Sequence, residues 1–499
     1  MISAISSFTF SPFANPNFSR INSSSKHRGK STTARSSSSS SSATPAKLPA
    51  IRVAKRVVLV RHGQSTWNAE GRIQGSSDFS VLTDKGEAQA LTSRQMLIEE
   101  SFDVCFASPL SRALRTTEII WGNREREMIL DYDLREIDLY SFQGLLKHEG
   151  KEKFGDAYRQ WQVDAPNFVI DDHYPVRELW ARARSCWNRI LAHDSKSVLV
   201  VAHNAVNQAL IASSIGLGTG YFRRILQSNC GVSALDFIPR AADGSPHVCL
   251  NRLNQTQNSP IVTGSSGGRN TSQQIILVCR GSLNNVAEVN YPLLGDVPLS
   301  MLGVIQSQKA AELLLDVRVD TVVTTPRKAM TETADIISKL QGAADCLVAD
   351  YVPRHVDIKH MDVLDVENIF MQINRSRIDV TTVYPTWLEG FGDEVLGALW
   401  DQSKKAWHSL LEELQSVSRP GRNVVVVCHP VVHIALIAHC LNLTKEWMSS
   451  FHLDDGSISV LDFPDGPSGK GAVRCTNYTA HLGRWSIPIT KPTSDELEV

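Results

Sequence analysis

Short apolar runs alternate along the chain with segments of mixed polarity. Three of these runs, 57–60, 103–107 and 198–202, are rich in valine and other residues that favour buried strands. Strands that alternate with helical segments predict an α/β fold, in which helices cover both faces of a mainly parallel sheet. Ligands of such sheets bind where the strands end. The polar residues that come after the runs are therefore the first candidates for a functional site.

The segment between the first two runs is expected to hold a helix. Thr83 is suited to cap its N-terminus, because a threonine hydroxyl accepts a hydrogen bond from a first-turn amide. Ala88, Leu91 and Ile98 then fall near one face at helical spacing. We expect this face to pack on the sheet.

A second helix is expected directly after the run 103–107. Ser108 is suited to cap it, and Pro109 suits the first helical position. Arg112 then lies in the first turns, where free amides and the helix dipole favour an anion. The apolar face of this helix would carry three residues at helical spacing: Ala113, Thr117 and Ile120.

The same order of patterns occurs a second time. Four segments, 275–278, 321–326, 424–429 and 456–463, repeat the patterns of 57–60, 104–109, 198–203 and 231–237, at offsets between 217 and 226 residues. A repeat of this length predicts a tandem duplication of one domain. With 499 residues, the chain is also too long for one core and suits two domains with tails. We expect a leader over 1–50, a first domain over 51–250, a linker over 251–274, a second domain over 275–485 and a tail over 486–499.

The leader differs from the rest of the chain in composition. It contains six lysines and arginines, no aspartate or glutamate, and an unbroken serine run over 36–42. A basic, serine-rich leader without a continuous apolar segment is typical of an organelle transit peptide, and the excess of serine over arginine favours the chloroplast. We therefore expect a disordered leader and a mature protein in the chloroplast stroma.

The net charge, the length of the apolar runs and the spacing of the cysteines argue against several kinds of partner and site. The formal net charge is −1 at pH 7, and loss of the basic leader would make it more negative, so no nucleic-acid partner is expected. No apolar run is long enough to cross a bilayer, so no membrane partner is expected either. The nine cysteines are scattered without a Cys-x-x-Cys pair, which argues against a disulfide framework and a zinc site. We expect most of them to be buried thiols.

The residues at the ends of the predicted strands suit chemistry on phosphate. Arg61 and Arg112 offer planar, permanently charged groups that match phosphate oxygens. His62 can be neutral and nucleophilic near pH 7, and His203 can donate to the same oxygens in the transition state. Glu136, in a polar segment, is suited to protonate the leaving alkoxide and then to activate water. These five residues form the candidate catalytic set.

The order of the motifs resembles the histidine phosphatase superfamily, which has the phosphoglycerate mutase-like fold. The motifs are Arg61–Asn68, Gln74-Gly75, Leu82-Thr83, Ser108–Ala113, Leu134–Glu136 and Val201–His203. The resemblance implies two tandem three-layer αβα domains, with His62 as the residue that carries the phosphoryl group. It also implies a substrate-binding set of Arg61, Asn68, Gln74, Gly75, Arg112 and His203. No metal ion or other cofactor is expected, because arginines supply the positive charge.

The second copy lacks the nucleophile. Cys279 and Arg280 come after its first strand, and arginine cannot lose its proton to attack phosphorus. His429 is kept, and a basic residue, Arg327 or Lys328, lies near the position of the second arginine. We expect a non-catalytic domain that packs against the first one.

The segments 143–147, 154–161 and 173–180 are expected to form a lid over the pocket. Three of their cations are candidates to contact a second anionic group of the substrate: Lys147, Arg159 and Arg177. The resemblance implies hydrolysis of a small sugar-acid phosphate monoester. Two alternatives use the same residues, namely a phosphoglycerate mutase and a fructose-2,6-bisphosphatase-like or broad-specificity sugar phosphatase.

Overall fold

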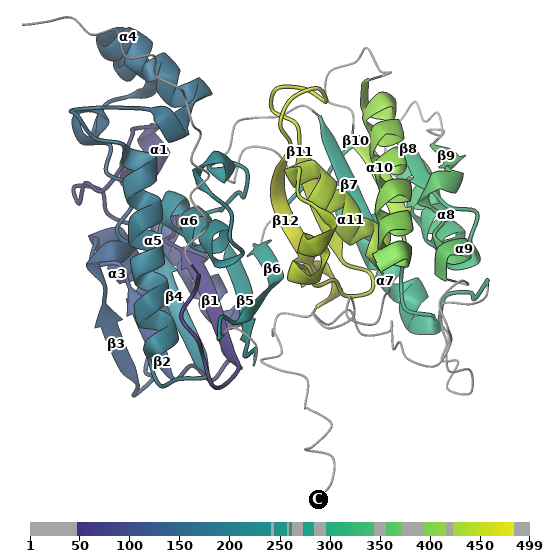
Figure 1. Ribbon diagram of the computed structural model, residues 1–499, viewed down its shortest axis with the longest axis horizontal. Helices are drawn as coiled ribbons and strands as arrows, with labels where there is room; N and C mark the ends of the chain where they lie inside the picture. The colour runs from purple at the N-terminus through teal and green to yellow at the C-terminus, as the bar shows by residue number, and fades with distance from the viewer. Residues whose placement is uncertain are drawn as a thin grey trace, which may run out of the picture. The chain divides into compact units, whose positions relative to one another are not determined.

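A computed structural model of the chain describes residues 47–240, 244–256, 259–261, 273–283, 296–343, 356–370, 393–415 and 423–483. Residues Pro45–Val499 form one compact unit (Figure 1). The expected tail 486–499 lies outside the described residues, as do nearly all of the leader 1–50 and much of the linker 251–274. The expectations for the leader and the tail stay predictions. The expected bounds of the linker are wrong at both ends, because residues 251–255 continue the strand His247–Gln255 and residue 274 begins the strand Gln274–Cys279.

The first half of the unit alternates strands and helices. Its strands are β1 (Lys55–Arg61), β2 (Val104–Ala107), β3 (Glu127–Leu130), β4 (Ser197–Ala202), β5 (Val232–Ile238) and β6 (His247–Gln255). Its helices are α1 (Thr66–Glu70), α2 (Asp84–Met96), α3 (Ser111–Trp121), α4 (Lys147–Val163), α5 (Pro175–Ala192) and α6 (Asn204–Ser214). The three strands expected from the apolar runs are confirmed as β1, β2 and β4.

The second half repeats this order. Its strands are β7 (Gln274–Cys279), β8 (Val319–Thr324), β9 (Asp357–His360), β10 (Asn423–Cys428), β11 (Ile458–Asp462) and β12 (Ala472–Tyr478). The helices described in it are α7 (Met301–Leu314), α8 (Lys328–Ala343), α9 (Glu367–Phe370), α10 (Asp393–Gln415) and α11 (Pro430–Leu441).

The strands described in the two halves belong to one 12-stranded sheet, in the order β3-β2-β4-β1-β5-β6-β12-β11-β7-β10-β8-β9. The last six strands repeat the first six in reverse, so the halves are related by an internal pseudo-twofold. Four strands of each half are parallel, and two antiparallel strands lie beside them toward the centre of the sheet. The expected α/β fold with a mainly parallel sheet is confirmed.

Alternation along the central strands places helices on both faces of the sheet. In β1, Val57 and Leu59 pack in a buried cluster with α5 and α6, whereas Val58 and Val60 pack with α2 and α3. The strand β7 divides its apolar residues in the same way, between α10 and α11 on one face and α7 and α8 on the other. Each half is therefore a three-layer αβα arrangement.

Strands β6 and β12 join the two halves. They pair antiparallel through Leu253 and Thr476, and the largest buried apolar cluster continues from the first half into the second. This continuity differs from the separate cores that the chain length predicted. The reason is that each of these strands has a neighbour on only one side within its own half, and an unpaired edge is satisfied by the other half.

Helix α2 buries a different face from the one expected. Ala88, Leu91 and Ile98 are exposed. A Cβ on Gly86 would lie 2.1 Å from the carbonyl oxygen of Gln64, so glycine allows the helix to approach the loop after β1. This close approach, rather than the apolar residues, sets the rotation of the helix. Its buried residues are Gly86, Ala90, Ser93 and Met96.

One of the two expected helix caps is confirmed and the other is wrong. The Thr83 hydroxyl accepts a hydrogen bond from a first-turn amide of α2. Helix α3 begins only at Ser111, whose amide donates to the Asp78 carboxylate (2.6 Å). Leu110 occupies the N-cap position, so Ser108 is not the cap and Pro109 precedes the helix instead of beginning it. The Ser108 hydroxyl lies 2.7 Å from Nε2 of His203. The expected apolar face of α3 is buried at all three positions, Ala113, Thr117 and Ile120.

The described cysteines behave as expected. Eight of them are free and buried: Cys105, Cys186, Cys230, Cys249, Cys279, Cys428, Cys440 and Cys475. Burial raises the pKa of the Cys230 thiol to about 12. Cys346 lies outside the described residues. No helix within the described ranges is long and apolar enough to span a membrane.

Truncation after Gln255 tests whether the first half is stable without the second. We expect an aggregating fragment, because β6 becomes an open sheet edge and Leu253, 1% exposed in the full chain, loses its cover. Its unfolding midpoint should fall by about 10 °C or more, which corresponds to several kcal/mol for a domain of this size. Size-exclusion chromatography and thermal denaturation measure both effects. A monodisperse fragment with the midpoint of the full chain would contradict this expectation.

Candidate active site

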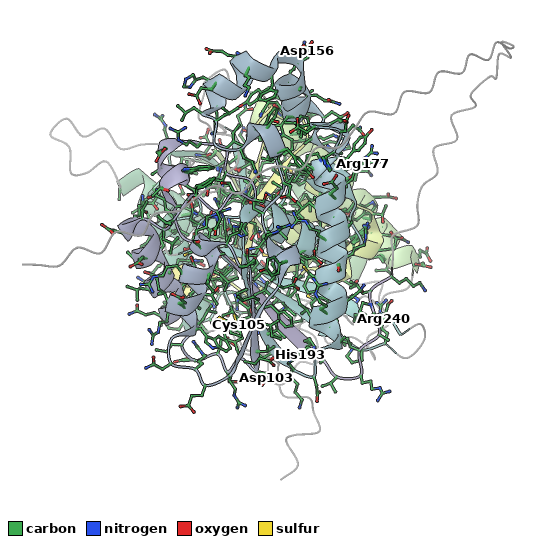
Figure 2. The ribbon with its side chains drawn as sticks, turned by 90° about the vertical axis from the view of Figure 1, so that its left-hand side faces the viewer. Asp103, Cys105, Asp156, Arg177, His193 and Arg240 are labelled. Atoms are coloured by element: carbon green, nitrogen blue, oxygen red, sulfur yellow. The ribbon has the colours of Figure 1, made fainter. Side chains whose placement is uncertain are left out.

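The candidate catalytic residues lie at the carboxyl ends of the parallel strands of the first half. His62 comes directly after β1, Ser108 after β2 and His203 after β4. Figure 2 shows the two ends of this half, with Asp103, which precedes β2, at one end and Asp156, on α4, at the other. The site therefore occupies the edge of the sheet at which open α/β folds bind their ligands.

Backbone contacts fix the position of His62. Its amide donates to the Ala202 carbonyl (3.0 Å) and extends the β1–β4 ladder by one residue. A Cβ on the next residue, Gly63, would lie 2.3 Å from the carbonyl oxygen of Gly86. Only glycine allows this contact, which locks the loop after β1 against α2.

The same loop orients the imidazole ring. The Nδ1 atom of His62 lies 2.7 Å from the Gly63 carbonyl oxygen. Because a carbonyl only accepts hydrogen bonds, Nδ1 carries the proton of the neutral ring and Nε2 carries the lone pair. Burial, together with the charges of Arg112 and Arg61, holds the pKa of His62 well below its ordinary value of 6.5. His62 is therefore neutral at pH 7, with Nε2 suited to attack.

Two buried guanidinium groups lie beside this ring. Arg61 is 5% and Arg112 0% exposed, and neither forms an ion pair with any residue that the structure describes. Arg61 Nη1 donates to the Gln227 carbonyl (2.8 Å), and Arg112 donates to the carbonyls of Ser77 (2.7 Å) and Gly75 (2.9 Å). Burial lowers the pKa of each arginine to about 10, so both stay charged at neutral pH. Backbone carbonyls position these charges without neutralising them.

His203 completes the cationic end of the site. Its ring centroid lies 5.0 Å from that of His62, and its Nε2 lies 2.7 Å from the Ser108 hydroxyl. Within the described residues, three buried nitrogens have no hydrogen-bond partner here: Nδ1 of His203, Nε of Arg61 and Nε of Arg112. Buried polar groups in native proteins are normally satisfied, and an anionic oxygen is the acceptor that would satisfy these.

Glu136 lies at the N-terminus of α6. Its carboxylate accepts hydrogen bonds from the amides of Ala205 (3.0 Å), Val206 (3.2 Å) and its neighbour Ile137 (3.0 Å). The first amides of a helix have no partner within the helix, and the helix dipole favours a negative charge there. Since α6 begins directly after His203, one helix start positions both side chains.

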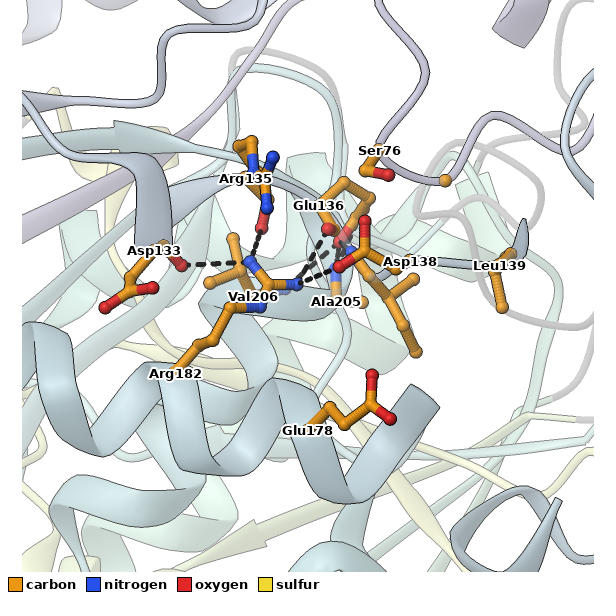
Figure 3. A network of polar contacts seen from close by, with 12 residues as sticks. Ser76, Asp133, Arg135, Glu136, Asp138, Leu139, Glu178, Arg182, Ala205 and Val206 are labelled. Carbon is orange, nitrogen blue, oxygen red and sulfur yellow. Dashed lines mark hydrogen bonds and ion pairs between the residues drawn. The ribbon is translucent and has the colours of Figure 1, made fainter. Parts of the chain in front are cut away.

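Arg182 of α5 holds the loop that carries Glu136 (Figure 3). Its guanidinium donates to the carbonyls of Asp133 (3.1 Å), Arg135 (2.8 Å) and Glu136 (2.9 Å). Sequence reasoning missed this residue, because it lies 46 positions from Glu136 in a helix whose apolar pattern predicts only packing. No local signal marks such a contact.

The three residues expected to line the phosphate pocket lie beside the catalytic set. The Gly75 carbonyl accepts a hydrogen bond from Arg112 directly. Asn68 Oδ1 accepts from Asn229 (3.3 Å), whose side chain also donates to the His62 carbonyl (3.0 Å). Gln74 accepts from the Ser65 hydroxyl (2.9 Å). Asn229 was missed from the sequence, although it lies just before the repeated segment 231–237.

The lid expected over 143–147, 154–161 and 173–180 stays a prediction. Lys147 and Arg159 are exposed on α4. Segment 173–180 belongs largely to the start of α5, which packs in the core. Arg177 is bound by Asn167 (2.6 Å). The core residues at the start of α5 are Val176, Leu179 and Trp180.

A matching hydrogen bond in each half identifies the residue of the second half that corresponds to Arg112. The Thr116 hydroxyl donates to the Arg112 carbonyl (2.8 Å), and the Thr333 hydroxyl donates to the Ala329 carbonyl (2.9 Å) in the same way. Ala329 therefore stands where the first half has its second arginine. The guanidinium is lost at this position.

Two basic residues, Arg327 and Lys328, lie near this position, as expected, but neither occupies it. Arg327 is paired with Asp365 (2.7 Å). The Lys328 amide donates to the Asp296 carboxylate, as Ser111 does at the start of α3. Neither residue takes the position of the lost arginine.

The remaining positions of the second half are also changed. The turn that ends at Leu364 has the same hydrogen bonds as the turn that ends at Leu134, so Val366 takes the place of Glu136. Arg280 lies 3.2 Å from Asp455, which compensates its charge. Of the five catalytic positions, only the second histidine is kept.

Comparison with known proteins finds one family model that matches both halves and two relatives that are similar over most of the chain. The model of the histidine phosphatase superfamily (branch 1) matches residues 57–243 and, again, residues 275–474. A probable 2-carboxy-D-arabinitol-1-phosphatase of Arabidopsis thaliana is 66% identical over 445 residues, which cover 89% of this chain and 91% of the relative. The 2-carboxy-D-arabinitol-1-phosphatase of Triticum aestivum is 59% identical over 453 residues, or 90% of this chain and 91% of that protein.

A shorter relative matches only one half. A probable phosphoglycerate mutase GpmB of Cronobacter sakazakii is 34% identical over 187 residues, which cover 36% of this chain and 85% of that protein. The full-length relatives therefore share the tandem arrangement, and the shorter one corresponds to a single half. With two matches to the family model that together span most of its length, this chain belongs to the histidine phosphatase superfamily.

Proposed function

We propose that this protein hydrolyses 2-carboxy-D-arabinitol 1-phosphate through a phosphohistidine at His62, without a metal ion. The observation that carries the reaction type is the neutral imidazole of His62 beside two buried guanidinium groups that are held by backbone carbonyls. The substrate is taken from relatives that are 66% and 59% identical over about nine tenths of the chain. The product is the free sugar acid, so the reaction would remove a phosphorylated inhibitor of Rubisco.

The first step forms the covalent intermediate. Nε2 of His62 attacks phosphorus, and the bond from phosphorus to the sugar oxygen breaks as Glu136, which enters this step as the carboxylic acid, donates its proton to that oxygen and becomes the carboxylate. Charge spreads over the three remaining phosphoryl oxygens in the transition state. Arg61, Arg112 and His203 are held near His62 without a bound substrate, which supports a transition state that needs little reorganisation.

The second step releases phosphate. Glu136 takes a proton from water, the water oxygen attacks phosphorus, and the bond from phosphorus to His62 breaks. This returns the neutral imidazole and yields inorganic phosphate. A mutase would instead return the phosphoryl group to a second hydroxyl of a sugar acid. The high identity to named phosphatases over the whole tandem chain favours hydrolysis over that alternative.

A panel of substrates tests the proposal. The purified protein is incubated with 2-carboxy-D-arabinitol 1-phosphate, 3-phosphoglycerate and fructose 2,6-bisphosphate, and free phosphate is followed in the presence of EDTA. We expect the highest kcat/KM for the first compound and no loss of rate with the chelator. Isomerisation of phosphoglycerate without phosphate release would support the mutase, and restoration of a lost rate by Mg²⁺ would contradict a metal-independent mechanism.

We also propose that the protein acts in the chloroplast stroma, on the basis of its basic, acid-free and serine-rich leader. Fluorescence of the full chain fused to a fluorescent protein, compared with a fusion that lacks residues 1–50, tests this location. Equal distribution of the two fusions would contradict it.

His62→Ala should abolish turnover and phosphohistidine formation. The rate should fall by at least about a thousandfold, equivalent to about 4 kcal/mol in activation free energy, because no other nucleophile replaces the ring. Rapid acid-free denaturation after exposure to ³²P-labelled substrate should trap label on the wild-type protein only. Thermal denaturation controls for folding. Label that persists in a folded His62→Ala protein would point to another nucleophile.

The pKa of His62 predicts an enzyme that stays active below pH 6.5. A histidine whose pKa is depressed in the folded state keeps its neutral, nucleophilic form down to that lower pKa, and loses it only as the pH falls further. NMR titration of the ring Cε1–H signal, assigned by comparison with His62→Gln, measures this directly. We expect no protonation between pH 7 and pH 6. A midpoint at or above 6.5 would contradict the assignment.

The second half should contribute no chemistry. Arg280→Ala should leave kcat nearly unchanged, because Arg280 is paired with Asp455 and has no partner in the first site among the described contacts. In a His62→Ala background, Arg280→His should not restore phosphate release, since Ala329 and Val366 supply neither the second guanidinium nor the acid. Phosphate release by the double variant would overturn this prediction.

A further inference from the structure

The segment 224–229 connects the active site to the second half of the chain. It lies between the turn after α6 and β5. On one side it binds Arg61, because the Gln227 carbonyl accepts from Arg61 Nη1 (2.8 Å). Asn229 donates to the carbonyl of His62 (3.0 Å). Both catalytic residues at the end of β1 are thus held by this one segment.

The other side of the segment is bound to β12. Residue Ile225 forms a parallel bridge with Val473. The Val473 amide donates to the Arg224 carbonyl (2.7 Å), and its carbonyl accepts from the Leu226 amide (2.9 Å). The residue directly after these two hydrogen bonds is Gln227, which holds Arg61. A single peptide unit therefore separates the second half from the support of a catalytic guanidinium.

The side chain of Arg224 reinforces this docking. Its three nitrogens donate to three carbonyls of the second half: Nη2 to Cys440 (2.7 Å), Nε to Gly471 (2.9 Å) and Nη1 to Leu441 (3.1 Å). A guanidinium that uses its whole fork on fixed carbonyls gives directional restraint as well as attraction. It binds the end of α11 and the start of β12 at once.

A third connection runs through Asn254 of β6. Its side-chain amide donates to the Arg474 carbonyl (2.9 Å) and the Ser228 hydroxyl (3.1 Å), and its oxygen accepts from the Ser228 amide (2.7 Å). All of these groups are buried. The segment is therefore fixed at Arg224, Leu226 and Ser228, on both sides of the carbonyl that binds Arg61.

We infer that the second half is a built-in positioning element for the active site, and that Arg224 is a positioning residue that acts through Arg61. Without docking on β12, the Gln227 carbonyl would lose its fixed place, and with it the orientation of the Arg61 guanidinium. This inference rests on the proposed phosphatase function only in that Arg61 binds a phosphoryl group. It gives the non-catalytic half a direct role in phosphate binding.

The pseudo-twofold supplies a matched control. Arg252 of β6 also crosses between the halves, with Asp454 at 2.9 Å and the Thr479 hydroxyl at 2.7 Å. It docks the corresponding segment of the second half, which holds no catalytic group. Arg252→Ala therefore weakens the same junction without releasing the support of Arg61.

Inhibition by inorganic phosphate and by vanadate is the readout, with hydrolysis of p-nitrophenyl phosphate as the assay. We expect Arg224→Ala to raise both inhibition constants about tenfold, because small displacements of a binding group cost this much or more. Arg252→Ala should leave them within about twofold, even where it lowers the unfolding midpoint as much. Arg224→Lys, which keeps the charge but not the fork, is a milder variant for use if the alanine variant does not fold, and should show an intermediate rise.

A double-mutant cycle shows whether Arg224 acts through Arg61. In an Arg61→Lys background, Arg224→Ala should produce no further rise in the inhibition constants. Unchanged phosphate inhibition in folded Arg224→Ala, an equal loss in Arg252→Ala, or full additivity in the cycle would each overturn the inference. A wild-type protein that neither hydrolyses phosphomonoesters nor binds phosphate would instead contradict the proposed function, so the two failures are distinguishable.

Discussion

The site depends on how two buried guanidinium groups are held away from water. Removal of such a charge from water costs several kcal/mol unless polar partners compensate for it. Arg61 and Arg112 find those partners in backbone carbonyls, and the more distant charge of Glu136 offsets only part of the cost of their burial. A carbonyl orients a guanidinium but leaves its charge in place. The charge is therefore available for a phosphoryl group. Burial and this charge together hold the pKa of His62 well below its ordinary value, which keeps the ring neutral.

This constraint explains the form of the loops around the site. A loop that presents carbonyls to a buried cation must be fixed from behind, since its own hydrogen-bonding groups point inward. The turn that presents the Gly75 and Ser77 carbonyls is closed by Gln143, whose side-chain oxygen accepts from the Ser76 amide (2.7 Å). The loop of Glu136 is closed by Arg182, and the segment 224–229 is closed by the second half. The loops that hold Arg112, Glu136 and Arg61 are thus each supported by parts of the chain that are far away in the sequence.

The positions of the candidate catalytic residues could be predicted from the sequence, but the residues that hold them could not. The strands 57–60 and 198–202 are apolar runs with a polar end, so the positions of His62 and His203 can be inferred from local pattern. The buried face of α2 cannot be inferred from local pattern. The close contact of Gly86 with the loop after β1 sets this face, and the apolar residues Leu91 and Ile98 stay exposed. Ser108 resembles a helix cap locally, yet its hydroxyl binds a histidine 95 positions away. Arg182 and Arg224 bind backbone carbonyls. Every residue has such a carbonyl, so the sequence does not indicate which one a distant arginine binds.

The second half of the chain shows how a site of this fold changes once its buried charges are lost. Ala329 and Val366 need no polar partner, and Arg280 has the carboxylate of Asp455. The described part of the second half therefore contains no uncompensated guanidinium at this site that only a ligand could satisfy. The second half keeps its pairing edge: β12 binds β6 and the segment 224–229 with a row of backbone hydrogen bonds. A strand edge gives fixed geometry regardless of most side chains, so a half that has lost its chemistry can still determine where a catalytic arginine points in the other.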